Sequence, residues 1–185
     1  MSTQSAEKLL LDRMTQYSVS QPVHPDMDEL REVLTLLSDQ QKLHLLQQKY
    51  SGWRKPLYFA AVKGHTDIIN TLLTSLQSSA NRLKLLILDN DYTPLHVAAH
   101  CGNTETMKVI LDCLTPDQRI QLMSVQGRWE KTAIEMAEQN GHTDTVRVLM
   151  EYQQRVLTEY QQRAERLQKQ QEQSRLHKSV SGRLS

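Results

Sequence analysis

Three segments of the chain share one pattern of small, apolar and glycine positions, and this repetition constrains the fold more than any other feature. The segments are KPLYFAAVKGHTDIINTLL at 55–73, TPLHVAAHCGNTETMKVIL at 93–111 and KTAIEMAEQNGHTDTVRVLM at 131–150. Gly64, Gly102 and Gly141 align, with an alanine four positions before each. Each segment predicts two short helices joined at the glycine, with one apolar stripe that a single helix pair cannot bury. The segments are therefore expected to stack on one another.

The middle segment shows the physical reason for this pattern. Pro94 suits the first turn of a helix, where its missing N–H costs nothing, and Thr93 can cap that helix. Gly102 can supply the positive φ that ends the first helix, so a second helix starts directly after it. Ala98 and Ala99 allow two helices to approach closely. The prediction is an all-α stack.

The run T-P-L-H-x-A followed by a glycine resembles the signature of the ankyrin repeat family. The first segment departs from the signature at Lys55 and Tyr58, and the third at Ala133 and Glu135. The resemblance covers residues 50–152. It implies an ankyrin-repeat solenoid of stacked helix–turn–helix units with finger loops, and a role in binding other proteins.

The repeats are longer than those of the family. Gly64 to Gly102 is 38 residues and Gly102 to Gly141 is 39, whereas ankyrin repeats have a period of about 33. The extra residues fall in three segments, 37–50, 76–91 and 114–127. Each has a hydroxyl residue suited to capping near its start, followed by apolar residues at helical spacing. We therefore expect a short additional helix in every repeat.

Composition divides the chain into three parts. Residues 1–25 are expected to form an N-terminal tail with at most a short helix. The segment 27–37 matches a second helix, so the ankyrin domain is placed at 26–152, as a half repeat and three full repeats. Residues 153–185 are rich in glutamine and carry seven Lys/Arg against three Glu. They predict a helical extension that ends in a disordered basic tail at 177–185.

Charge and composition exclude several classes of function. The net charge is +1, so nothing in it demands nucleic acid or an acidic membrane as a partner. Two cysteines are expected to be free thiols in a reducing compartment. Neither a secretory signal nor a stretch of roughly twenty apolar residues is present, which predicts a cytoplasmic or nuclear protein. With no catalytic constellation or cofactor motif, we expect no enzyme activity, cofactor or small-molecule substrate.

The finger loops carry the most specific functional signal. Trp53, Tyr92 and Trp129 precede the three helix starts in register, and the chain has only two tryptophans. Aromatic residues and Arg dominate binding hot spots, so we expect an interaction stripe; the alternative is that the rings pack on neighbouring fingers. By the family's pattern the surface continues onto the exposed ends of the first helices. The predicted protein-binding residues are Trp53, Arg54, Val62, Lys63, Tyr92, His100, Cys101, Arg128, Trp129, Gln139 and Asn140. Their mixed character fits a protein or peptide better than nucleic acid.

A second interpretation is an oligomerisation or structural role for a helix at 151–173. The sequence EYQQR occurs twice there, starting at 151 and at 159. Val156, Tyr160 and Leu167 form a thin apolar stripe, interrupted by polar residues. The stripe is compatible with a monomer or with weak self-association.

A third interpretation is a metal site at His96, His100 and Cys101. The two histidines are four residues apart, a spacing that places two ligands on one helical face. The resemblance instead assigns His96 to hydrogen bonds between adjacent repeats. No second His/Cys pair has ligand spacing, so we expect no bound metal.

Overall fold

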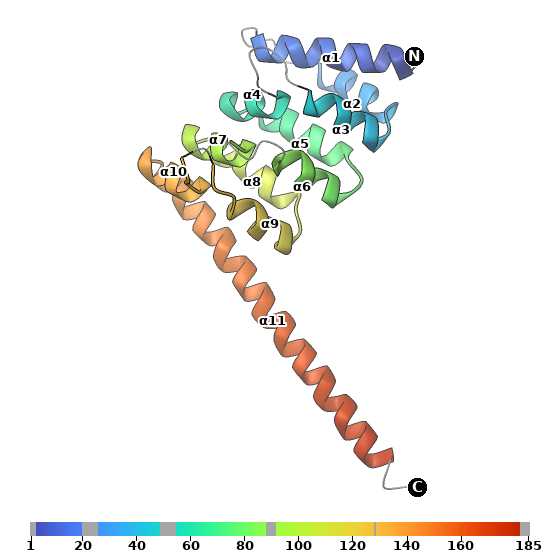
Figure 1. Cartoon of the computed structure of the whole chain (residues 1–185), viewed down its shortest axis with the longest axis vertical. Coiled ribbons are helices and arrows are strands. Elements are labelled where there is room, and N and C mark those ends of the chain that lie inside the picture. The colour runs from blue at the N-terminus through green and yellow to red at the C-terminus, as the bar shows by residue number, and fades with distance from the viewer. Residues whose placement is uncertain (1–2, 20–25, 49–54, 88–91, 128, 182–185) are drawn as a thin grey trace.

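The computed structural model describes residues 3–19, 26–48, 55–87, 92–127 and 129–181. Within these ranges every regular element is an α-helix, and the helices stack into a solenoid from which one long helix projects (Figure 1). The helices are α1 (Thr3–Val19), α2 (Met27–Thr35), α3 (Asp39–Gln47), α4 (Pro56–Lys63), α5 (Thr66–Ser75), α6 (Ser79–Ile87), α7 (Pro94–Cys101), α8 (Thr104–Asp112), α9 (Pro116–Met123), α10 (Ala133–Gln139) and α11 (Thr143–Ser181). The predicted all-α solenoid with additional helices and a C-terminal helical extension is confirmed.

The helices form three rows (Figure 1). The first row holds α1, α4, α7 and α10; the second holds α2, α5, α8 and the start of α11; the third holds the additional helices α3, α6 and α9. Each helix packs against its counterpart in the next repeat. Ala61, Ala98 and Ala137 are 0% exposed in the first row, because small side chains there let neighbouring helices approach. One continuous apolar core runs through the stack.

Capping residues set the helix boundaries. Thr93 accepts a hydrogen bond from the His96 backbone N–H at 3.3 Å, and Thr115 forms a full capping box at the start of α9. Gly102 has φ 71° and ends α7. Lys55, which replaces the family's threonine, makes no side-chain cap in α4. The departure at Lys55 therefore removes a side-chain cap, whereas Glu135, in place of the family's histidine, completes a capping box with Thr132 at the start of α10.

Helix α1 corrects the expectation for residues 1–25. Instead of a tail with a short helix, the chain forms a helix of 17 residues that packs against α2, α3 and α4. Ala6 and Leu10 are 0% and 1% exposed, so α1 occupies the position of a first-row helix and completes the N-terminal repeat. The segment lacks the T-P-L-H signature, and its place is determined by the apolar surface it covers.

Polar side chains at the glycine turns connect successive repeats. The Asn103 amide donates a hydrogen bond to the Ala61 carbonyl at 2.7 Å. His142 donates from Nε2 to the His100 carbonyl at 2.9 Å. Both residues directly follow a turn glycine, and both acceptors lie at the end of the preceding first-row helix, where carbonyls have no partner within the helix. Each repeat thus caps the one before it.

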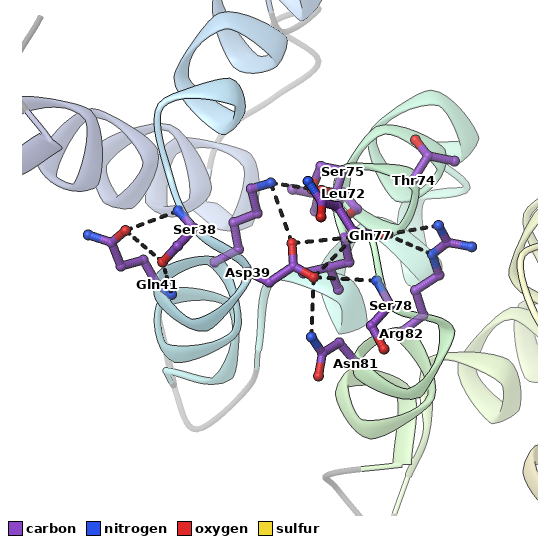
Figure 2. Close-up of polar contacts among 12 residues, drawn as sticks. Ser38, Asp39, Gln41, Leu72, Thr74, Ser75, Gln77, Ser78, Asn81 and Arg82 are labelled. Atoms are coloured by element: carbon purple, nitrogen blue, oxygen red, sulfur yellow. Dashed lines mark hydrogen bonds and ion pairs between the residues drawn. The ribbon is translucent and has the colours of Figure 1, made fainter.

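The third row carries a further set of contacts, shown for α3 in Figure 2. The Asp39 carboxylate accepts hydrogen bonds from the backbone N–H groups of Gln77 at 3.0 Å and Ser78 at 3.4 Å, and from the Asn81 amide at 3.2 Å. These donors lie at the start of α6, where negative charge is favourable. Burial acts to raise the pKa of Asp39, but the hydrogen bonds and the Lys42 ammonium outweigh it and leave the pKa lowered.

A basic residue four positions after each capping residue binds the C-terminal end of a second-row helix. The pairs are Lys42 with the Ser75 carbonyl at 2.7 Å, Arg82 with the Cys113 carbonyl at 3.2 Å and Arg119 with the Leu111 carbonyl at 2.9 Å. Cations are favourable at helix C-termini, where carbonyl groups lack partners. We did not single out these residues from the sequence, although their fixed offset from the capping residue was a signal for them.

Helix α11 begins as a second-row helix and extends over 39 residues. Its next two turns remain attached to the stack, because the Tyr152 hydroxyl donates to Asp112 at 2.6 Å and the Tyr160 hydroxyl donates to Asp117. Burial, together with the hydrogen bond to Asp112, raises the pKa of Tyr152 to about 12. The two EYQQR copies therefore each supply one tyrosine that binds α11 to the end of α8 or the start of α9.

Beyond Tyr160, residues 161–175 of α11 do not pack against the rest of the described chain. Every residue of 161–175 is exposed, and the helix projects away from the repeats (Figure 1). Residues 177–181, which we expected to be disordered, belong to α11, whereas 182–185 lie outside the described residues. Residues 177–181 are His, Lys, Ser, Val and Ser, mostly weak helix formers. They continue a helix that the preceding Gln-, Glu- and Arg-rich residues already form, because extending a helix is far easier than starting one.

Candidate protein-binding surface

Trp129 lies on the finger between α9 and α10, and 59% of its surface is exposed. The finger is a tight loop, in which the Gly127 N–H donates to the Lys131 carbonyl at 2.9 Å and the Glu130 N–H donates to the Gly127 carbonyl at 2.8 Å. Glu130 has φ 55°, a left-handed conformation that is uncommon for a residue other than glycine. The backbone of this finger thus holds a large apolar ring in solvent.

Tyr92 has a different environment, since it is half-buried and packs against the core. Its ring centroid lies 5.6 Å from that of Trp129 in an edge-to-face arrangement, 6.2 Å from Tyr58 and 6.1 Å from His96. Aromatic pairs at such distances stabilise one another. Tyr92 therefore supports Trp129 from the core side, which is the packing alternative considered for the finger aromatics.

Tyr58 is a residue of this surface that the sequence-based prediction omitted. It occupies in α4 the position that His96 has in α7, and its half-buried ring also lies 5.7 Å from Phe59. The alignment of the repeats carried the signal, because a residue in the T-P-L-H histidine position faces the neighbouring finger. Tyr58, Tyr92 and Trp129 form an aromatic line across three repeats.

The ends of the first-row helices form the second part of the predicted surface. Lys63 and Gln139 are exposed, whereas Val62 is half-buried and packs against the core. The Lys131 ammonium donates to the Gln139 side-chain oxygen at 2.6 Å. Lys63 thus offers a charge directly to a partner, and Gln139 is already positioned by the last finger.

His100 and Asn140 come together from adjacent repeats. The Asn140 amide donates to His100 Nδ1 at 3.0 Å and to the Met136 carbonyl at 2.7 Å. Both side chains are exposed, and Cys101 beside them is half-buried. The pair forms a polar bridge on the surface, with its outer edges free to meet a partner. Trp53, Arg54 and Arg128 lie outside the described residues, and their assignment stays a prediction.

The proposed metal ligands do not converge. His96 is 0% exposed; its Nε2 donates to the carbonyls of Val125 and Lys131 at 3.1 and 3.0 Å, which leaves Nδ1 to accept from the Thr93 hydroxyl at 2.7 Å. Burial lowers the pKa of His96, and burial raises the pKa of the Cys101 thiol. Both ring nitrogens of His96 are thus engaged in linking two repeats. Among the described residues no three His, Cys, Asp or Glu are grouped as a metal would require.

Charges of both signs are spread along the surface. The last repeat exposes Glu130 and Glu138, and the first full repeat exposes Lys63. A nucleic-acid surface would instead present a continuous basic stripe. The mixture of one large exposed aromatic ring, polar groups and scattered charge has the character of a protein-binding surface.

Stacked helix–turn–helix units with glycine turns and fingers define a helical repeat protein, a class that presents extended binding surfaces. The family model described as ankyrin repeats in three copies matches residues 28–124 and 76–160, and the chain belongs to the ankyrin repeat family. Ankyrin repeats generally mediate protein–protein interaction and are not a catalytic module.

One solved structure with the same fold contains two proteins in complex. It is the crystal structure of the yeast ribosomal protein Rps3 in complex with its chaperone Yar1, one chain of which matches with a TM-score of 0.55 and 19% identity over 82% of this chain and 94% of that chain. At this identity the likeness shows the fold alone. No curated protein sequence matches the chain. Among the described helices, none is long and apolar enough to cross a membrane.

Proposed function

We propose that the protein is a non-enzymatic adaptor or scaffold that binds a protein partner across its fingers and the ends of its first-row helices. The observation that carries the proposal is Trp129, a tryptophan 59% exposed on a finger whose backbone is held by two hydrogen bonds. A large rigid ring costs little conformational entropy when a partner covers it. Burial of the exposed indole surface on binding would therefore contribute favourable free energy with little entropic cost.

The rest of the surface supports this role in different ways. The half-buried Tyr92 ring supports Trp129, and the half-buried Tyr58 ring lies behind Tyr92; both rings have less exposed surface than Trp129 for direct contact. Lys63, His100 and Asn140 supply polar groups along the same row of helices, in the arrangement of a polar rim around an aromatic anchor. Trp53 and Arg54 would extend the surface at the first finger. We place the complex in the cytoplasm or nucleus, in line with the cysteine content.

The test compares capture of partners by the unaltered full chain and by three variants of it in its native cells, with quantitative mass spectrometry. Trp129→Ala is expected to weaken binding by about 30-fold, the effect of losing a hot-spot residue worth about 2 kcal/mol. The Trp53→Ala, Trp129→Ala double variant is expected to lose more. Ile120→Ala is the matched control, because Ile120 is 41% exposed on α9 and outside the fingers.

Stability separates a binding role from a packing role. Trp129→Ala should change the free energy of unfolding by at most about 1 kcal/mol, since the ring loses mainly its edge contact with Tyr92. Capture that is reduced equally by Trp129→Ala and Ile120→Ala, or reduced only in proportion to lost stability, contradicts the proposal. Partners that remain bound to the double variant would place the interaction elsewhere on the chain.

A further inference from the structure

The last repeat exposes a face that the preceding repeats bury. At the two positions five and nine residues after each turn glycine, the first two full repeats have side chains that are 0% exposed: Ile69, Leu73, Met107 and Leu111. The counterparts in the last repeat are Val146, which is half-buried, and Met150, which is 50% exposed. The difference arises because no further repeat of the described chain covers α10 and α11.

The turn glycines show the same open end. A Cβ built on Gly102 would lie 2.7 Å from the His142 ring of the next repeat, whereas one built on Gly141 would meet nothing within 4 Å. A hollow of about 670 Å³ lies here, between the turn at Gly141 and the first turns of α11. Its floor includes Val146 and Met150, and Glu138, Arg147 and Glu151 stand among its lining. This open face has an apolar floor and charges of both signs around it.

The open face continues along α11 as a lane without charge. The lane consists of Val146, Met150, Gln154, Leu157, Gln161, Ala164, Gln168 and Gln171. Its members recur at spacings of three and four residues, so they share one side of the helix. Apart from Val146 all are exposed, and Leu157 reaches 53%. Met150, Leu157 and Ala164 are spaced by seven residues, which is the period of a coiled-coil seam.

The rest of the same helix is highly charged, which makes the lane distinct. Between 150 and 172 the charged residues are Glu151, Arg155, Glu159, Arg163, Glu165, Arg166, Lys169 and Glu172. Glu172, four residues after Gln168, lies at the edge of the lane where it ends, and the others lie outside it. A helix that is surrounded only by solvent gains no stability from keeping its charged residues off one side. A helix that pairs with a second copy of itself does gain stability, because identical residues then face each other and a charge on the lane would repel its own counterpart.

We propose that two copies of the chain pair side by side through the open face and the lane, with their α11 helices parallel and a two-fold axis between them. In this arrangement Val146 and Met150 contact the equivalent apolar residues of the other copy, as Ile69 and Leu73 contact the next repeat within one chain. Arg147 and Glu151 beside the hollow pair with each other at 2.7 Å, so they present little unbalanced charge to the same pair on the other copy. The lane then continues the contact along a helix that nothing else covers.

The tyrosine attachments give α11 a defined direction for this pairing. Tyr152 and Tyr160 bind α11 to α8 and α9, so the rod projects at a fixed angle. Tyr152 lies on the side away from the lane and Tyr160 lies beside the lane, three residues after Leu157, which itself stays 53% exposed. From residue 161 to 181 the rod extends by roughly 30 Å, at 1.5 Å per residue. Glutamine fills half of the lane, and such a seam is weaker than one of leucine and isoleucine. A reversible dimer is expected.

The oligomeric state of the full chain tests the proposal. Analytical ultracentrifugation over a range of concentrations should show a monomer–dimer equilibrium, and Leu157→Glu should weaken the dimer by at least about tenfold. Gln162→Glu adds the same charge to the same exposed helix outside the lane and should leave the equilibrium unchanged. Circular dichroism should show equal helix content in all three proteins, because Leu157 makes little contact within one chain.

Cross-linking tests the direction of pairing. Under mild oxidation Leu157→Cys should form a covalent dimer, since residue 157 faces its own counterpart only when the helices are parallel, and the unaltered chain with its two half-buried cysteines should not. A monomer at every concentration overturns the proposal, and so does a dimer that Leu157→Glu leaves intact. A dimer that is sensitive to Leu157→Glu but gives no covalent species with Leu157→Cys overturns the parallel arrangement. Capture of a different protein by the lane, with the chain itself monomeric, also counts against it.

Discussion

Substituting the turn glycines one at a time separates the cost of an unusual backbone angle from the cost of disturbing the contact between repeats. Gly102 and Gly141 have nearly the same φ, 71° and 73°, so alanine suffers the same backbone strain at both positions. That strain is about 1–2 kcal/mol for a residue with a side chain. The surroundings differ, because the next repeat covers Gly102 and leaves Gly141 open.

The structure gives the size of the difference. At Gly102 the new Cβ would lie 2.7–3.0 Å from three atoms of the His142 ring, including Cγ, the ring carbon bonded to the His142 Cβ. The whole ring has to move, and its hydrogen bond to the His100 carbonyl is lost, which costs about 1 kcal/mol. We expect Gly102→Ala to lower the free energy of unfolding by about 2–3 kcal/mol and Gly141→Ala by about 1–2 kcal/mol.

Urea denaturation followed by circular dichroism measures both values, and Gly64→Ala provides an internal check. A Cβ on Gly64 would lie 3.2 Å from the side-chain oxygen of Asn103, a milder conflict than the one at Gly102. The expected order of destabilisation is Gly102→Ala, then Gly64→Ala, then Gly141→Ala. Equal losses in all three variants would refute the reasoning, because backbone strain alone would then account for the effect.

Two further predictions concern pH. Asp39→Asn removes the charge that Gln77 and Ser78 bind at the start of α6, and should lower the free energy of unfolding by about 1–2 kcal/mol in urea denaturation. Because the pKa of Asp39 is lowered in the folded protein, this loss of stability should persist above the usual pKa of 3.8 and shrink as the pH falls below that value. A loss of stability that is independent of pH would contradict this. His96 has a pKa lowered by burial, so the unfolded chain binds a proton that the folded one does not, and melting temperature should decline as pH falls below 6.5. His96→Gln should be less stable at neutral pH and should show a smaller decline between pH 7.5 and 5.5; an identical decline in both proteins would contradict the assignment.

The sequence predicted the repeating core because its signals are local. Thr93, Pro94 and Gly102 determine the ends of α7 without help from distant residues, and the same pattern in three copies identified the helix pairs. The additional helices were also predictable, since capping hydroxyl groups and apolar spacing both lie within a few residues. Local interactions of this kind can be predicted from a single sequence.

The features that the sequence did not reveal depend on contacts between distant segments. Helix α1 belongs to the stack because Ala6 and Leu10 are covered by other helices, and no motif marks that contact. Val156 and Tyr160 were grouped with Leu167 as one stripe, yet the structure turns the first two toward the repeats. The uncovered lane lies beside them on the helix, and only the packing of α11 against α8 and α9 distinguishes the two sides.

The same reason explains the outcome at the fingers. Spacing placed Tyr92 and Trp129 in equivalent loops, but Tyr92 packs against the core and lies 6.2 Å from the Tyr58 ring of the neighbouring repeat, whereas Trp129 is 59% exposed. The departure of Tyr58 from the family's histidine therefore matters for the surface and has little effect on the helix that carries it. Which of these rings is exposed depends on such contacts between repeats, which spacing in the sequence does not show.

Site-specific photo-cross-linking in the native cell tests the binding surface most directly. A photoreactive amino acid introduced at position 130, which is exposed on the same finger, would leave the Trp129 indole in place, and one at position 120 would serve as control on α9. We predict that irradiation joins a protein partner to position 130 and not to position 120. Cross-linking of the same partner with equal yield at both positions, or at position 120 alone, would contradict the proposed role of the finger surface.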